Sequence, residues 1–319
     1  GVDTDEPVMR AINHPVGHVT EALLRWWYRR SLEDGQGLPG EIKPTFTEFC
    51  DTRTEKFRHG RVLLAAHVIA LFRVDRDWTM HHLLRLFDWR ESKSEARAAW
   101  EGFLWSPRLY RPLMEVLKPA FLETARHYAA LGKHDGQYAS LLTFTALDPG
   151  DTFTIAELAA AIRSLPPDGL LESARALVRA LEGGGEQRAD YWTNRIVPYL
   201  HAIWPKSRDN ISPGIAESLS RLCVAAHDAF PEALMLLRAW LQPLAHPDYL
   251  VHRLHEAGLC GRFPKQALDL LSLVIGDQTH WPPDDLGECL KAIREADHQT
   301  ATDARFRQLS TYLRRHARE

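Results

Sequence analysis

The amino-acid sequence predicts an all-α protein, arranged as an array of antiparallel helix pairs. Three observations favour this fold class. Helix-start and helix-stop signals recur along all 319 residues, alternating β-branched stretches are rare, and one apolar pattern returns later in the chain. The stops divide the chain into roughly fifteen helices of about three to four turns. Short loops between such helices place neighbours antiparallel.

The segment INHPVGHVTEALLRWWYRR, residues 12–30, is predicted to contain the first long helix. Positions spaced i, i+3, i+4 and i+7 share one helix face, and here they are Leu23, Trp26, Trp27 and Arg30. An apolar face of this kind packs against the protein interior. We therefore expect this helix to bury both tryptophans.

Later helix starts are marked by capping boxes, in which a side chain and a glutamate three residues on satisfy free N–H groups. The pairs are Thr52 with Glu55, Ser92 with Glu95, Thr154 with Glu157, and Asp285 with Glu288. Ser212 followed by Pro213 predicts a further start, because proline is favoured in the first helical turn.

Glycine and proline mark the helix ends and suggest one boundary between subdomains. The clearest stops are Gly132, Pro166–Pro167, Gly183–Gly185 and Pro205. Because a triple glycine is flexible, we expect an aromatic-rich helical subdomain over residues 1–182 and a helical-repeat subdomain over residues 186–319. The first contains six of the ten tryptophans. One continuous array remains the alternative.

An internal repeat supports the array. FPEALMLLRAWL from Phe230 and FPKQALDLLSLVI from Phe263 both begin Phe-Pro and continue into a leucine-rich face, 33 residues apart. That period is one helix–turn–helix unit. The expected fold is therefore a HEAT/TPR-like right-handed superhelix, with a helix bundle as the rival.

Composition excludes some function classes. The formal net charge is −3, which disfavours a general nucleic-acid binder. No apolar run of about 18 residues occurs, so no membrane span or membrane partner is expected. The four cysteines, Cys50, Cys223, Cys260 and Cys289, lie far apart in apolar segments. They are typical of reduced core thiols in a cytoplasmic protein. Because the chain starts with glycine, we expect a fragment of a longer protein.

Histidine pairs do not form a metal motif. The pairs are His14 with His18, His81 with His82, and His252 with His255, the last near Cys260. None has the ligand set of a zinc site, so no metal is predicted.

Catalytic and cofactor motifs are weak as well. Asp51, Glu55 and His59 lie close in sequence but are interpreted as a helix surface, not as an acid–base site. The triple glycine is flanked by acids and lacks the lysine of a phosphate loop, and no GxGxxG occurs. No cofactor is predicted.

Two clusters of aromatic residues and arginines have two interpretations. One contains Trp26, Arg29 and Arg30, and the other contains Arg108 and Arg111. Such residues dominate protein-interface hot spots, but they also cover the edges of ordinary cores. If the chain has a protein-binding face, these five residues are predicted to form it.

NHPVGHVTEALLRWW (residues 13–27) and WEGFLWSPRLYRPL (residues 100–113) resemble the helical C-terminal region of large bacterial proteins. In that family the region follows a sirtuin-like NAD-hydrolysing domain that acts in anti-phage defence. The resemblance is clearest up to Leu244. It implies that the helical region senses a trigger or holds the assembly inactive. Its partner would be the trigger protein or its own N-terminal domain.

The chain departs from an intact protein of that family. The glycine-rich NAD loop is absent, and His59-Gly60 is the one echo of a sirtuin catalytic histidine. No catalytic residue is therefore carried over. The resemblance implies a non-catalytic sensor or regulatory module of a defence NADase, with oligomerisation through the parent protein left open. Two alternatives remain, namely a generic helical-repeat scaffold and a hydrolase or metalloenzyme whose site is assembled from distant residues.

Overall fold

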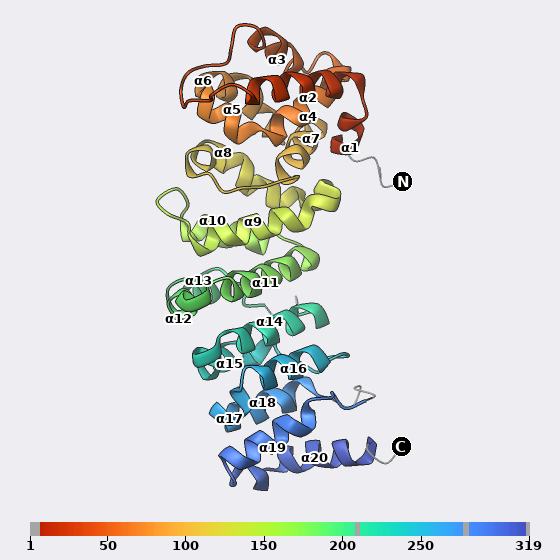
Figure 1. Cartoon of the computed structure of the whole chain (residues 1–319), viewed down its shortest axis with the longest axis vertical. Coiled ribbons are helices and arrows are strands. Elements are labelled where there is room, and N and C mark those ends of the chain that lie inside the picture. The colour runs from red at the N-terminus through yellow and green to blue at the C-terminus, as the bar shows by residue number, and fades with distance from the viewer. Residues whose placement is uncertain (1–6, 208–210, 277–280, 317–319) are drawn as a thin grey trace. The chain divides into compact units, whose positions relative to one another are not determined.

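The computed structural model describes residues 7–207, 211–276 and 281–316, and within these ranges it contains helices and no strand. The all-α prediction is confirmed. The chain divides into two compact units, Gly1–Gly169 and Leu170–Glu319. Within each unit, helices that follow one another in sequence lie next to one another (Figure 1). No helix of the described ranges is long and apolar enough to cross a membrane.

The first unit contains fourteen named helical elements. They are α1 (Pro7–Ile12), α2 (Pro15–Tyr28), α3 (Lys43–Phe49), η1 (Glu55–Phe57), α4 (Arg58–Ala66), α5 (Val68–Val74), α6 (Arg76–Trp78), η2 (Thr79–Leu83), η3 (Leu84–Phe87), α7 (Lys93–Leu104), α8 (Arg111–Thr124), η4 (Ala125–His134), α9 (Asp135–Leu147) and α10 (Ile155–Arg163). Helix α4 is central and packs against α1, α2, α3 and α7.

The crossing of α4 and α7 is close because a glycine lies in the interface. A Cβ atom at Gly102 would lie 2.3 Å from the carbonyl oxygen of Val62, so no larger residue fits without moving one helix. The adjoining core is aromatic, with Trp100 and Phe87 in edge-to-face contact at a centroid distance of 5.0 Å. This tight α4–α7 pair is the framework for the side chains described below.

Helix α2 buries one tryptophan, not two. Trp27 is fully buried with Leu24 and Thr20, whereas Trp26 is 37% exposed. The prediction that both are buried was wrong for Trp26. Trp26 precedes Trp27 in α2, so its ring points to a different side of the helix. There the Arg30 guanidinium covers the ring, 3.8 Å from the ring centroid.

The predicted helix starts had different outcomes. Thr154 and Glu157 form the complete capping box of α10, and Ser212 caps α14 as predicted. Ser92 caps α7 through the backbone N–H of Glu95, although the Glu95 carboxylate is used elsewhere. The prediction of a capping box formed by Thr52 and Glu55 was wrong, because the residue that precedes η1 is Thr54.

The remaining pair, Asp285 with Glu288, was wrong as a capping box. Asp285 does precede α19, but its side chain makes no cap hydrogen bond to that helix. Its carboxylate accepts a hydrogen bond from His252 instead.

The second unit continues the helical pattern. Its elements are α11 (Pro167–Glu182, which begins just before the unit boundary), η5 (Gly185–Gln187), α12 (Arg188–Tyr191), η6 (Trp192–Ile196), α13 (Val197–Ala202), α14 (Pro213–Ala225), η8 (His227–Ala229), α15 (Phe230–Leu237), η9 (Arg238–Trp240), α16 (Asp248–Glu256), α17 (Leu259–Arg262), α18 (Pro264–Val274), α19 (Leu286–Ala296), η10 (Thr300–Thr302) and α20 (Ala304–His316). Gly183–Gly185 lies within this unit, so the subdomain boundary expected there stays a prediction.

The two copies of the Phe-Pro pattern pack against each other. Phe230 and Phe263 have ring centroids 6.2 Å apart, and helix α15 contacts α18. Helix α14 contacts α16, α16 contacts α19, and α18 contacts α20. Alternate helices thus meet along this unit. All four cysteines are buried and free, as the sequence predicted.

Candidate functional site

A concave site lies in the first unit, between α1, η1, α4, α7, η4 and the loop that contains Trp89. Its volume is about 600 Å³. This falls within the range of small-molecule pockets, about 300–1,000 Å³. We call it the cationic cleft because of its charged lining residues. These are Arg10, Lys56, Arg58, Lys93, Arg97 and Glu55.

Five basic side chains and one carboxylate thus line the cleft. Lys93 and Arg97 are one turn apart on α7, so they share a helix face. Lys56 and Arg58 come from the η1–α4 junction, and Arg10 comes from the end of α1. The cations thus reach the same volume from three separate segments.

A buried ion pair lies beneath the cleft. The Glu95 carboxylate accepts hydrogen bonds from Nε of Arg61 at 2.8 Å and from Nη2 of Arg61 at 2.9 Å. The exposed fractions of the two side chains are 2% for Arg61 and 8% for Glu95. Arg61 also donates to the carbonyl oxygens of Phe49 and Asp51, at 3.1 Å and 2.9 Å. Nε, Nη1 and Nη2 of Arg61 therefore all have hydrogen-bond acceptors.

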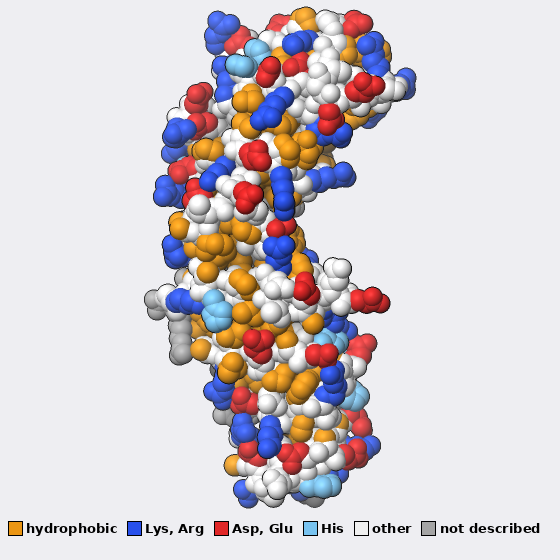
Figure 2. Space-filling view, turned by 90° about the vertical axis from the view of Figure 1, so that its left-hand side faces the viewer, with side chains coloured by type: hydrophobic (Ala, Val, Ile, Leu, Met, Phe, Trp, Pro, Cys, Tyr) orange, Lys and Arg blue, Asp and Glu red, His pale blue; other side chains and the backbone are white. Residues whose placement is uncertain are grey.

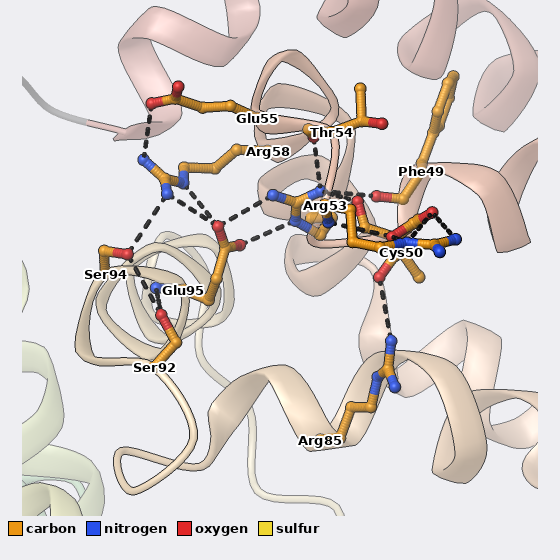
Figure 3. A network of polar contacts seen from close by, with 12 residues as sticks. Phe49, Cys50, Arg53, Thr54, Glu55, Arg58, Arg85, Ser92, Ser94 and Glu95 are labelled. Carbon is orange, nitrogen blue, oxygen red and sulfur yellow. Dashed lines mark hydrogen bonds and ion pairs between the residues drawn. The ribbon is translucent and has the colours of Figure 1, made fainter.

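Arg58 connects this pair to the cleft. Its Nε donates to Glu95 at 2.9 Å, and its Nη2 lies 3.3 Å from the Ser94 hydroxyl (Figure 3). The Glu55 carboxylate lies 3.9 Å from Arg58 on the other side. The guanidinium is thereby held at the cleft wall, with about a third of the side chain exposed.

The charge of Glu95 is set by its surroundings. Burial by itself would raise the pKa of Glu95, but hydrogen bonds and charges from Arg61 and Arg58 reverse the effect and lower the pKa. Glu95 is therefore ionised at neutral pH and neutralises Arg61.

Two stacked ring pairs contribute to the cleft walls. His59 stacks on His14 with a centroid distance of 3.9 Å, and His127 stacks on Trp89 with a centroid distance of 4.4 Å. His14 is itself fixed, because its Nδ1 accepts from the backbone N–H of Val16 at 3.1 Å. The cleft therefore combines cations with planar rings.

His59 favours the neutral form. Burial lowers its pKa, and electrostatic interactions with His14, Arg10, Arg58 and Arg61 lower it further. A neutral imidazole offers one hydrogen-bond donor and one acceptor. His59 can thus bind a polar ligand group without adding to the positive charge.

The trio Asp51, Glu55 and His59 is only partly brought together. Glu55 and His59 line the cationic cleft, whereas Asp51 lines a separate, more open depression. There Asp51 binds Nη2 of Arg53 at 2.7 Å. The arrangement does not form the acid–base trio, in line with the surface interpretation of these residues.

The first predicted binding cluster lies at the end of α2, away from the cleft lining. Trp26 and Arg30 form the cation–π pair described above, and Arg30 also lies 3.5 Å from Glu41. Arg29 is exposed and adjoins the C-terminus of α2.

The second predicted cluster surrounds the start of α8. Arg108 is exposed, and Arg111 forms an exposed ion pair with Asp148 at 2.8 Å. Among the described residues, no hydrogen bond, ion pair or ring contact joins this cluster to Trp26, Arg29 or Arg30. The five residues are surface-accessible, and their role in binding stays a prediction.

The C-terminal histidine pair faces a carboxylate in the second unit. Nδ1 of His252 lies 2.8 Å from Asp285, and Nδ1 of His255 lies 3.7 Å from the same side chain. Cys260 is buried beside this segment. Within the described ranges, no group of three or more His, Cys, Asp or Glu side chains is placed to hold a metal ion.

Sequence reasoning missed the cleft because its residues are dispersed. The lining extends from Pro7 to Ala130, and each segment reads locally as an ordinary charged helix surface. The usable signal was the pair of cation-rich helix starts, EKFRHGR and KSEAR, but their proximity depends on the α4–α7 packing.

Comparisons with known proteins give one partial similarity. A stretch of 130 residues is 29% identical to an uncharacterised protein of Sinorhizobium fredii, y4cA. The stretch covers 40% of this chain and 11% of that protein. No family model and no solved structure matches the chain.

Proposed function

We propose that this chain is a non-catalytic sensor or regulatory module of a larger protein, and that it recognises an anionic ligand in the cationic cleft. The observation that carries the proposal is the meeting of five cations and one carboxylate around a cavity of about 600 Å³. Concentrated charge of one sign in a concave site attracts a ligand of opposite charge. The charge of Arg61 does not add to this field, since Glu95 neutralises it.

The fixed wall of the cleft favours binding. Nε and Nη2 of Arg58 are held by Glu95 and Ser94, so the side chain is already ordered, and its Nη1, 3.9 Å from Glu55, is the nitrogen left to approach an anion. Lys56 and Lys93 are exposed and can turn toward the ligand. The site thus combines one pre-positioned cation with mobile ones, which suits recognition of an anion.

We also propose that the helices form a HEAT/TPR-like right-handed superhelix. The alternating contacts α14–α16–α19 and α15–α18–α20 support this arrangement in the second unit. Stacked helix pairs present extended surfaces for protein recognition. Trp26, Arg29, Arg30, Arg108 and Arg111 are the proposed protein-contact residues.

The parent protein is proposed to be a cytoplasmic defence NADase, on the resemblance of residues 13–27 and 100–113 to that family. The partner of the module is then the trigger protein or the N-terminal NAD-hydrolysing domain. Two measurements test this. The coding sequence upstream of Gly1 should contain a glycine-rich NAD loop, and the purified chain should leave NAD intact. NAD turnover by the purified chain would contradict the non-catalytic role.

Anion binding is tested with inorganic tripolyphosphate. Calorimetric titration at low ionic strength should detect binding, and added salt should weaken it because screening grows with ionic strength. Reversing two exposed cleft charges, in Lys56→Glu/Lys93→Glu, should weaken binding at least tenfold. The matched control, Lys265→Glu/Lys291→Glu, changes the net charge equally but lies in the second unit. Equal affinity of both double variants would refute the cleft as the site.

A further inference from the structure

We infer that the cationic cleft is a nucleotide site, with the base stacked against His127 and the phosphates held among the cations. The inference rests on the proposed function, since it names the chemical class of the anion. Two features of the cleft carry it, namely the ring platform and the distribution of the cations around it.

The ring platform is held rigid from behind. The Trp89 indole N–H donates to the Thr124 hydroxyl at 2.7 Å, which fixes the indole plane. The His127 ring lies on this indole with an interplanar angle of 16°, so its own plane is set. Trp89 is 3% exposed, whereas a quarter of the His127 side chain is accessible. His127 is therefore the more accessible ring of the pair, and its Nε2 lies 3.8 Å from the Glu123 carboxylate.

A flat, pre-positioned ring is suited to stack on a nucleobase. Every base has a π-face, so such stacking is tolerant of base identity. His127 and Trp89 both line the same cleft as Lys93 and Arg97. A ligand that contacts both features must therefore combine a planar ring system with a strongly acidic group.

The cations match a polyphosphate. Lys93 and Arg97 lie on one face of α7, and Lys56 and Arg58 approach from the η1–α4 junction. Phosphate oxygens accept hydrogen bonds from arginine and lysine side chains. The Glu55 carboxylate of the lining can accept hydrogen bonds from the hydroxyl groups of a ribose.

The overall charge of the chain disfavours a nucleic-acid strand. The formal net charge is −3, and the molecular face in Figure 2 has acidic and basic side chains interspersed. A strand needs an extended basic track beside the stacking rings. A single nucleotide needs only the cleft.

The test compares ATP, GTP, tripolyphosphate and adenosine by calorimetric titration of the whole chain. We expect ATP and GTP to bind at least tenfold more tightly than tripolyphosphate, a difference of about 1.4 kcal/mol. Adenosine should bind much more weakly than either nucleotide. His127→Ala should remove the preference for ATP over tripolyphosphate, and His127→Phe should retain it because the flat ring is kept. Lys56→Glu/Lys93→Glu should weaken ATP and tripolyphosphate alike, whereas Lys265→Glu/Lys291→Glu should bind both normally.

The outcomes separate this inference from the function on which it rests. Equal affinity for ATP and tripolyphosphate, with no effect of His127→Ala, would overturn the nucleotide site and leave the anion site standing. Tighter binding of a hexaglutamate peptide than of ATP would also overturn it and favour an acidic protein segment. Absence of binding by every anion would overturn both proposals. Circular dichroism of each variant shows whether a lost signal reflects lost folding.

Discussion

Replacing Glu95 by glutamine should destabilise the first unit strongly, because it leaves the buried Arg61 guanidinium without its counter-ion. The variant removes the negative charge of the carboxylate, which accepts hydrogen bonds from Nε and Nη2 of Arg61 at 2.8 Å and 2.9 Å. Bonds to charged groups contribute roughly 1.5–3 kcal/mol each, and breaking a buried ion pair typically costs about 3–5 kcal/mol. Arg61 keeps its carbonyl acceptors but is only 2% exposed, so water cannot replace the carboxylate. We expect a loss of about 3–5 kcal/mol.

The measurement should report on the first unit alone, since the chain contains two units. Urea-dependent hydrogen exchange of amides in α4 and α7 gives the free energy of unfolding of that region. Glu41→Gln is the matched control, because it removes the same charge from the exposed pair that Glu41 forms with Arg30 at 3.5 Å. An exposed pair contributes little to stability because water screens it, so the control should exchange almost as the wild type does.

The effect should also depend on pH in a defined direction. The pKa of Glu95 is lower in the folded chain than in the unfolded chain. The stability that ionised Glu95 contributes is therefore fully present above its pKa in the unfolded chain, about 4.3. It is lost as the pH falls through its pKa in the folded chain. Wild type and Glu95→Gln should converge in acid. A loss at pH 7 no larger than that of Glu41→Gln would refute the claim that this pair supports the cleft.

Three further outcomes are expected. Thr154→Ala should cost about 1 kcal/mol, measured by urea unfolding, because the hydroxyl caps α10 and Glu157 completes the box; an unchanged midpoint would contradict this. The His59 resonances should titrate below about 6.5, and wild-type stability should fall as the pH drops from 7 toward 5, since the folded form resists protonation. His59→Asn should reduce that slope without abolishing it, because burial also lowers the pKa of His67, His82 and His227; an unchanged slope would contradict the contribution of His59. Arg108→Glu/Arg111→Glu should abolish the response to the protein partner with helicity retained by circular dichroism, because both side chains are exposed; loss of helicity would assign them a structural role.

The helices were predictable where their signals are local. Thr154 and Glu157 satisfy each other's N–H groups within one turn, so four residues of sequence decide the outcome. The Ser92 cap was equally local, but the Glu95 side chain turns to Arg61, 34 residues earlier. Periodicity likewise placed α2 but not its exact buried face, because the neighbours that cover Trp27 and leave Trp26 exposed come from the tertiary fold.

The cationic cleft could not be predicted in the same way, and the reason lies in what holds it together. Like charges repel, and the packing of α4 on α7 brings Lys56 and Lys93 to the same cleft in spite of that repulsion. That packing depends on the close approach at Gly102 and on the buried ion pair behind the wall, neither of which is a motif. The same repulsion gives the site its proposed function. An anion that neutralises these charges relieves their mutual repulsion and stabilises the first unit as it binds. Because binding changes the stability of the first unit, the fold is suited to signal that its ligand has bound.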